Sequence, residues 1–214
     1  MQTNSGVAHD TVIKLRILNS IDKPVSSMTV NDICRNASIS RQTFYNHFDN
    51  KFSIASWWSD YCEQFYMNRI GFDYSWEEGT LRHLRILFSK NKVLGIALGG
   101  GNFENLIPTI NRRRDIMFDS LKRRGVEIDE LLKYCVETFA EEGTRAATKL
   151  ITSYSEKTQS LVMATKKLVA ITPAPLYDAL QLPEYAQYSQ SENIARVEQI
   201  ALSILDEPME DLFY

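Results

Sequence analysis

Six polar side chains in residues 41–47 carry groups that can hydrogen-bond to the edges of DNA bases. The segment reads Arg-Gln-Thr-Phe-Tyr-Asn-His. Gln and Asn can each form two hydrogen bonds with adenine, and Arg can do the same with guanine, while Thr, Tyr and His suit phosphate oxygens. In a helix, Phe44 and Phe48 would share one face, with Arg41 and His47 on its flanks and the other polar side chains facing away. The spacing therefore predicts a helix face able to read bases.

Another short helix is expected just before it, over residues 29–37. Thr29 can cap the first turn, and Asp32 completes the S/T-x-x-D/E pattern of a capping box. Apolar residues recur at i, i+3, i+4 and i+7 and so share one face: Val30, Ile33, Cys34 and Ala37. A corner at residues 38–40 follows, and its Ser40 can cap the next helix. One short amphipathic helix is usually just a solvated face, but two capped helices joined by a corner favour base reading.

The run K-P-V-S-S-M-T-V-N-D-I-C-R-N-A-S-I-S-R-Q-T-F-Y-N-H-F-D-N-K, residues 23–51, resembles the N-terminal DNA-binding domain of TetR-family transcriptional regulators. The elements T-V-x-D-I and T-F-Y-x-H-F-x-x-K carry the likeness. The resemblance implies an all-helical homodimer in which a three-helix DNA-binding domain precedes a larger helical domain for dimerisation and, usually, a small-molecule effector. Ser38 stands where the family pattern usually has Gly, which matters if the corner needs a left-handed conformation.

The expected fold is therefore all-α, with a helix-turn-helix domain in residues 1–50 and a dimerisation and ligand-binding domain in residues 51–214. The expected function is that of an effector-responsive repressor of transcription, bound as a homodimer to an inverted-repeat operator in double-stranded DNA. The alternative is a co-regulator whose C-terminal domain binds a protein partner and no small molecule. The residues expected to contact DNA are Thr29, Ser40, Arg41, Gln42, Thr43, Tyr45, Asn46, His47 and Lys51.

Two helices must hold these residues in place. Apolar residues predict a first helix over residues 10–21, ended by Pro24 and packed behind the pair. A helix over residues 51–70 would connect the N-terminal domain to the rest of the chain. Lys51, at its start, could hold a phosphate, so a tilt of this helix would move a DNA contact directly.

The remaining sequence predicts a loop and a series of helices. The loop is expected at 71–79 and the helices at 80–89, 102–124, 127–153, 155–171 and 193–205, with a break at 172–176. The helices within residues 127–171 are assigned to a dimer interface as a four-helix bundle, because small residues allow close approach: Gly143, Ala146, Ala147 and Ala164.

Six aromatic residues could line the effector pocket that the resemblance implies, because such pockets are mostly apolar. Plain core packing is the commoner role of each. They are Tyr61, Phe65, Phe88, Phe103, Phe118 and Phe139.

The overall charge excludes a polycation that coats nucleic acid. The chain of 214 residues carries a net charge of −3, and its pI is about 5.7. Residues 1–51 hold six Lys and Arg against four acids, a net charge of +2, so the remainder carries −5. A mildly basic N-terminal part on an otherwise acidic chain favours DNA binding through one face of the protein. The affinity for DNA would then depend clearly on salt concentration.

The motifs of enzymes, metal sites and nucleotide sites are absent from the sequence, so we expect no enzyme activity, metal or cofactor. His9, His47 and His83 are isolated, and neither H-E-x-x-H nor G-x-S-x-G occurs. The glycine-rich residues 95–101 lack the Lys-Ser/Thr of a phosphate-binding loop, and Arg112-Arg113-Arg114 spans three helix faces. Three widely spaced cysteines, no leader segment and no apolar run of about 18 residues predict a cytoplasmic protein that is not membrane-bound.

Overall fold

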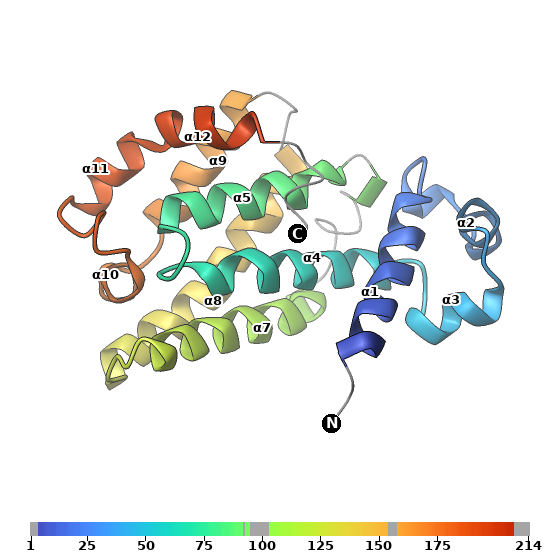
Figure 1. The fold of residues 1–214 in the computed structure, drawn as a ribbon, viewed down its shortest axis with the longest axis horizontal. Coiled ribbons are helices and arrows are strands. Elements are labelled where there is room, and N and C mark those ends of the chain that lie inside the picture. Colours follow the sequence, from blue (N-terminus) through green and yellow to red (C-terminus); the bar gives the residue numbers. More distant parts are fainter. Residues whose placement is uncertain (1–3, 92, 95–102, 154–157, 208–214) are drawn as a thin grey trace.

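The computed structural model describes residues 4–91, 93–94, 103–153 and 158–207 (Figure 1). Apart from one isolated bridge between Ile70 and Tyr74, regular structure in these ranges is helical. The predicted all-α class is therefore confirmed. The glycine-rich residues 95–101 lie outside the described residues, as do residues 208–214.

Three helices and a short 3-10 turn form the N-terminal part of the chain. They are α1 (Asn4–Asn19), η1 (Val25–Ser27), α2 (Val30–Ala37) and α3 (Arg41–His47). Ile17 of α1, Ile33 of α2 and Phe44 of α3 are fully buried together. Helix α1 begins at Asn4, earlier than the predicted residue 10. The residues before position 10 show no apolar periodicity, so their spacing does not predict a helix there.

The rest of the chain packs around one central helix. Its elements are α4 (Ser53–Tyr66), η2 (Met67–Arg69), α5 (Trp76–Ser89), α7 (Phe103–Arg123), α8 (Glu130–Ser153), α9 (Thr158–Ala170), α10 (Ala174–Leu180), α11 (Gln190–Ala195) and α12 (Val197–Leu205). Helix α4 packs against both α5 and α7, while α8 packs on α7 and α9 on α5 (Figure 1). Helix α4 also begins beside the N-terminal helices and is thus the structural link that the sequence predicts.

Two elements begin at positions that differ from the prediction. Helix α5 starts at Trp76, within the predicted loop, because Ser75 and Glu78 form a reciprocal capping box. Helix α10 follows Pro173 directly, where only a break was expected, since proline is tolerated in the first turn of a helix. The predicted helix over residues 193–205 is two helices, α11 and α12, that meet at Arg196.

The buried apolar side chains form two clusters. The larger one runs from α1, α2 and α3 through Ile54 and Trp58 of α4 into α5, α9 and α12. The smaller one joins α5, α7, α8 and α10 around Trp76 and Met117. The larger cluster crosses residue 50 without interruption, so the N-terminal helices share their core with α4.

A buried ion pair joins α4 to α7. Glu63 and Arg113 are almost fully buried, at 1% and 2% exposure, and Arg113 Nε donates to Glu63 Oε2 over 3.2 Å. The Nε2 atom of His83 on α5 lies 3.4 Å from Glu63 Oε1. Burial would raise the pKa of Glu63, but Arg113 outweighs that effect and lowers it, whereas burial lowers the pKa of His83. The middle member of Arg112-Arg113-Arg114 is thus a structural residue, paired with a glutamate.

The small residues predicted at a dimer interface are used inside the chain. A Cβ atom at Gly143 would lie only 2.8 Å from Nη1 of Arg113, so this glycine makes room for the buried ion pair. Ala147 and Ala164 belong to the larger apolar cluster. Apolar side chains that α8 and α9 expose lie elsewhere on these helices: Leu131 at 60%, Tyr134 at 65% and Met163 at 48%.

Candidate nucleic-acid interface

Helix α2 is capped as the sequence predicts. The amide of Asp32 donates to Thr29 Oγ1 over 3.2 Å, and the amide of Thr29 donates to Asp32 Oδ2 over 3.0 Å. The Thr29 hydroxyl also donates to Asp32 over 2.7 Å. These bonds satisfy donors that the first turn would otherwise leave unpaired. The start of α2 is therefore fixed, and its Ile33 and Cys34 are held against the core.

The corner between α2 and α3 depends on a left-handed serine. Ser38 has φ of 54° and ψ of 48°. The Ser38 amide donates to the carbonyl of Arg35 over 3.2 Å, and the Ile39 amide donates to the carbonyl of Cys34 over 3.0 Å. This is the Schellman pattern of helix ends, in which the left-handed residue is usually glycine. Ser38 therefore adopts its left-handed conformation at a cost in free energy.

Replacing this serine is expected to stabilise the protein. Ser38→Gly should raise the free energy of unfolding by about 1 kcal/mol, because a left-handed conformation costs an L-residue about 1–2 kcal/mol and glycine almost nothing. Urea unfolding measures the change. Ser40→Gly is the matched control: Ser40 has φ of −77° and caps α3 through its side chain, so its loss should not stabilise. An equal or lower stability of Ser38→Gly would contradict the expectation.

Helix α3 presents most of the predicted polar residues to solvent. Ser40 Oγ caps it by accepting from the amide of Thr43 over 2.9 Å. Phe44 and Phe48 are buried beneath it, as predicted. The exposed side chains on its outer side are Arg41, Gln42, Tyr45 and Asn46, while Thr43 is half-buried. Four of the predicted DNA-binding residues thus lie together on the exposed part of one helix.

His47 and Lys51 hold the N-terminal helices together. His47 Nδ1 lies 2.7 Å from Oδ1 of Asp10 on α1, whose Oδ2 pairs with Lys14 over 2.9 Å. Burial raises the pKa of Asp10, but the hydrogen bonds from Lys14 and His47 outweigh it, so the net effect is a lowered pKa. The ammonium of Lys51 donates to the carbonyls of Ser26 and Met28 over 2.8 and 2.7 Å. His47 is the last residue of α3 and Lys51 follows it closely in sequence, but both side chains are engaged within the chain.

An aromatic series connects α3 to the middle of α4. Ring centroids are 5.9 Å apart for Phe44 and Phe48, 5.9 Å for Phe48 and Trp57, and 5.4 Å for Trp57 and Tyr61. Tyr61 and Phe65 follow at 6.2 Å in stacked orientation. These separations lie in the range of favourable aromatic pairs. Trp57, Tyr61 and Phe65 recur every four residues, which places them on one face of a helix, but the contact of Trp57 with Phe48 depends on the fold.

No known family model and no curated protein matches the sequence. The functional conclusion must therefore come from the residues and their geometry. In the described ranges no group of three His, Cys, Asp or Glu side chains is placed to hold a metal ion. None of the described helices is both long and apolar enough to cross a membrane.

The six aromatic residues predicted to line one ligand pocket are spread over several places. Tyr61 and Phe65 line a groove between α4 and α7. Phe88 is buried in the larger apolar cluster and Phe139 in the smaller one, against which Phe118 packs. The side chain of Phe103 lies outside the described residues. Among the five whose side chains the structure describes, only Tyr61 and Phe65 thus line a groove together.

Proposed function

We propose that this protein is a sequence-specific transcriptional regulator that binds an inverted-repeat DNA operator as a homodimer. It would act as an effector-responsive repressor of the TetR type. The observation that carries the proposal is the exposed side of α3, where Arg41, Gln42, Tyr45 and Asn46 lie over a buried pair of phenylalanines. These are the residue types that hydrogen-bond to base edges and phosphates in the major groove.

The surroundings of α3 support a rigid reading surface. Its start is capped by Ser40, its end is tied to α1 through His47 and Asp10, and its inner face is buried. A side chain held on a fixed helix loses less conformational freedom when it binds than one on a loop. The net charge of +2 on residues 1–51 would favour DNA at this end of an otherwise acidic chain.

The link to α4 supplies a route for regulation. Lys51 fastens the start of α4 to the turn before α2, and the aromatic series joins α3 to the middle of α4. A tilt of α4 would therefore carry the reading helix with it. A ligand that favours one tilt would change DNA affinity by a coupling free energy of about 1–3 kcal/mol, typical of allosteric proteins.

Dimerisation is proposed through α8 and α9. Leu131 and Tyr134 on α8 and Met163 on α9 are exposed apolar side chains, which a second copy would cover. In the dimer, the two α3 helices would enter successive major grooves about 34–36 Å apart or a multiple of that distance.

Selection from a random double-stranded DNA library with the whole protein tests this function. We expect enrichment of an inverted repeat whose half-sites are centred about 10 base pairs, or a multiple of one helical turn, apart. Affinity for the enriched sequence should fall steeply with salt. Failure to enrich any sequence would overturn the function, and enrichment of a single unrepeated half-site would overturn the homodimer.

A further inference from the structure

A buried histidine lies beside the ion pair that joins α4 to α7. His83 on α5 is 1% exposed, and its Nε2 atom lies 3.4 Å from Oε1 of Glu63. Arg113 donates to the same oxygen through Nη2 and to Oε2 through Nε. One carboxylate of α4 therefore stands between two basic side chains, of which one comes from α5 and the other from α7.

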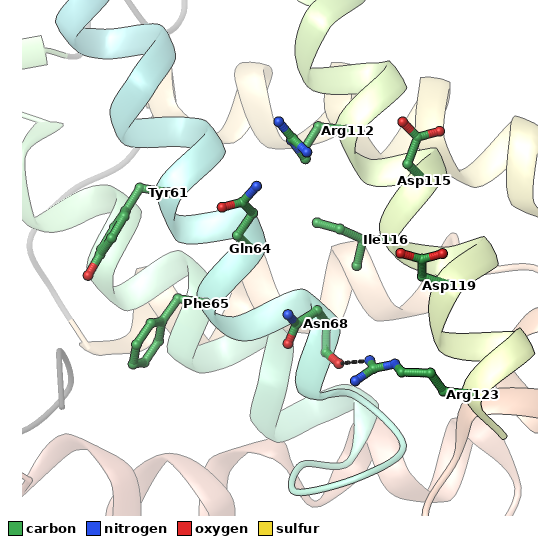
Figure 2. A pocket seen from close by; sticks show the side chains of 9 residues that line it. All are labelled: Tyr61, Gln64, Phe65, Asn68, Arg112, Asp115, Ile116, Asp119 and Arg123. Carbon is green, nitrogen blue, oxygen red and sulfur yellow. Dashed lines mark hydrogen bonds between the residues drawn. The ribbon is translucent and has the colours of Figure 1, made fainter. Parts of the chain in front are cut away.

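The interior around this cluster shields it from water. Arg112, the neighbour of Arg113, is exposed and lines the open groove between α4 and α7 (Figure 2). Arg113 and Glu63, by contrast, are 2% and 1% exposed. A charge added beside them would be poorly screened by solvent, so it would have to be balanced by the groups already present.

The His83 ring lacks a hydrogen bond of good geometry. This holds for both of its nitrogen atoms within the described residues. Most buried polar side chains in proteins have a partner, because burial removes their hydrogen bonds to water. Since Nε2 already lies beside a carboxylate oxygen, a proton on this atom would supply the bond that the ring lacks.

The ring is uncharged at neutral pH and takes up its proton in acid. Burial lowers the pKa of His83; Glu63 opposes this effect and Arg113 adds to it. Arg113 also keeps the pKa of Glu63 low, so the carboxylate is still charged where His83 becomes protonated. From the described parts of the helices packed on α5, the charged groups that act on His83 are thus Glu63 of α4 and Arg113 of α7.

We propose that His83 makes the contact between α4 and α7 sensitive to pH. When His83 takes up a proton from solvent, its Nε2–H donates to Oε1 of Glu63, and Arg113 keeps only the bond from its Nε to Oε2. The carboxylate then holds α4 more strongly to α5 and less strongly to α7. Acid thereby loosens α7 from the central helix.

A shift of α4 can reach the reading helix. Tyr61, two residues before Glu63 on α4, contacts Trp57, and Trp57 contacts Phe48 at the end of α3. An effect of acid on DNA affinity rests on the proposed function. The exchange of partners at Glu63 does not depend on DNA.

NMR titration of the histidine rings in the whole protein without DNA tests the buried group directly. His83→Gln identifies the His83 signal, and His9, which is exposed on α1, serves as the internal reference. We expect the His83 midpoint to lie clearly below that of His9. Equal midpoints would overturn the proposal, and this result does not depend on whether the variant folds.

Urea unfolding at pH 7.5 and pH 5.5 measures the linkage to stability. The unfolded chain binds the His83 proton more readily than the folded protein, so the folding equilibrium constant falls as the pH drops below about 6.5. One proton accounts for at most about tenfold per pH unit. His83→Gln should remove this part of the fall, and His9→Gln, the matched control, should keep it. The same fall in all three proteins would overturn the proposal.

Two spin labels across the groove measure the exchange itself. Gln64→Cys on α4 and Asp115→Cys on α7 place the labels at exposed positions on the two sides that Figure 2 shows. We expect the labels to move apart between pH 7.5 and pH 5.5, and to keep their separation when His83→Gln is added. An unchanged separation in the protein that retains His83 would overturn the exchange.

The selected DNA separates this proposal from the proposed function. If the labels move apart but affinity for that DNA responds to acid equally with and without His83→Gln, the exchange at Glu63 holds and its effect on α3 is refuted. Failure to select any DNA would concern the proposed function alone, since the measurements on His83 need no DNA.

Discussion

Replacing Tyr45 and Asn46 together by alanine is expected to lower affinity for the selected DNA by roughly a hundredfold or more. A good pair of hydrogen bonds to a base discriminates by about 1–3 kcal/mol, and the double variant removes two side chains from the exposed face of α3. Neither side chain belongs to the apolar core. Tyr45 is 47% exposed and Asn46 is exposed, while Phe44 and Phe48 are buried beneath them. Gel retardation with the selected DNA and with a scrambled duplex measures the effect.

The scrambled duplex separates base reading from general attraction. Because neither residue is charged, the weak non-specific affinity and its salt dependence should stay close to those of the unchanged protein. Tyr188→Ala is the control, since this tyrosine is 38% exposed and lies outside α3, α8 and α9. Tyr45 makes an edge contact with Phe44, so the melting temperature of each variant confirms that the fold is retained. Unchanged specific affinity in the double variant would refute base reading by α3.

Removing the buried charge of Glu63 is expected to be strongly destabilising. Glu63→Gln leaves the guanidinium of Arg113 buried without its counter-charge, which costs about 3–5 kcal/mol. In a chain of this size, each 1 kcal/mol lowers the melting temperature by about 2–4 °C. Thermal and urea unfolding measure the loss.

A double-mutant cycle shows whether the cost comes from the unpaired charge. Glu63→Gln with Arg113→Met removes both charges, and replacing a buried pair by uncharged groups is often nearly neutral, so much of the loss should be recovered. Arg145→Gln is the more exposed counterpart: Arg145 pairs with Glu141 over 2.9 Å, with side chains 37% and 46% exposed, and its loss should cost less than about 1 kcal/mol. If Glu63→Gln costs no more than Arg145→Gln, the ion pair does not hold α4 to α7.

Features that depend on neighbouring residues could be predicted from the sequence. The caps at Thr29 and Ser40 are local bonds between residues three apart, and the inward direction of Phe44 and Phe48 follows from helical spacing. The same logic would have placed the start of α5 at Trp76, because Ser75 and Glu78 have the spacing of a capping box. This spacing stands in the sequence among glycines and aromatic residues, which favour a loop.

Contacts between distant residues could not be predicted in this way. Glu63 and Arg113 are 50 residues apart, and His47 and Asp10 are 37 apart. Lys51 reaches two backbone carbonyls, and no pattern of side chains marks a carbonyl as an acceptor. For the candidate site, spacing predicted which side chains of α3 face outward, while the residues that fix the helix in place needed the fold.

The three cysteines have a practical consequence for measuring motion. Cys34, Cys62 and Cys135 are all buried and free. Burial also raises the pKa of the Cys34 thiol, and that of Cys62 well above its usual range, so little reactive thiolate forms there. A maleimide or spin label directed at one new surface cysteine near α3 should therefore react well ahead of the native thiols in the folded protein. Distances between two labelled copies could then be followed without first replacing any native cysteine.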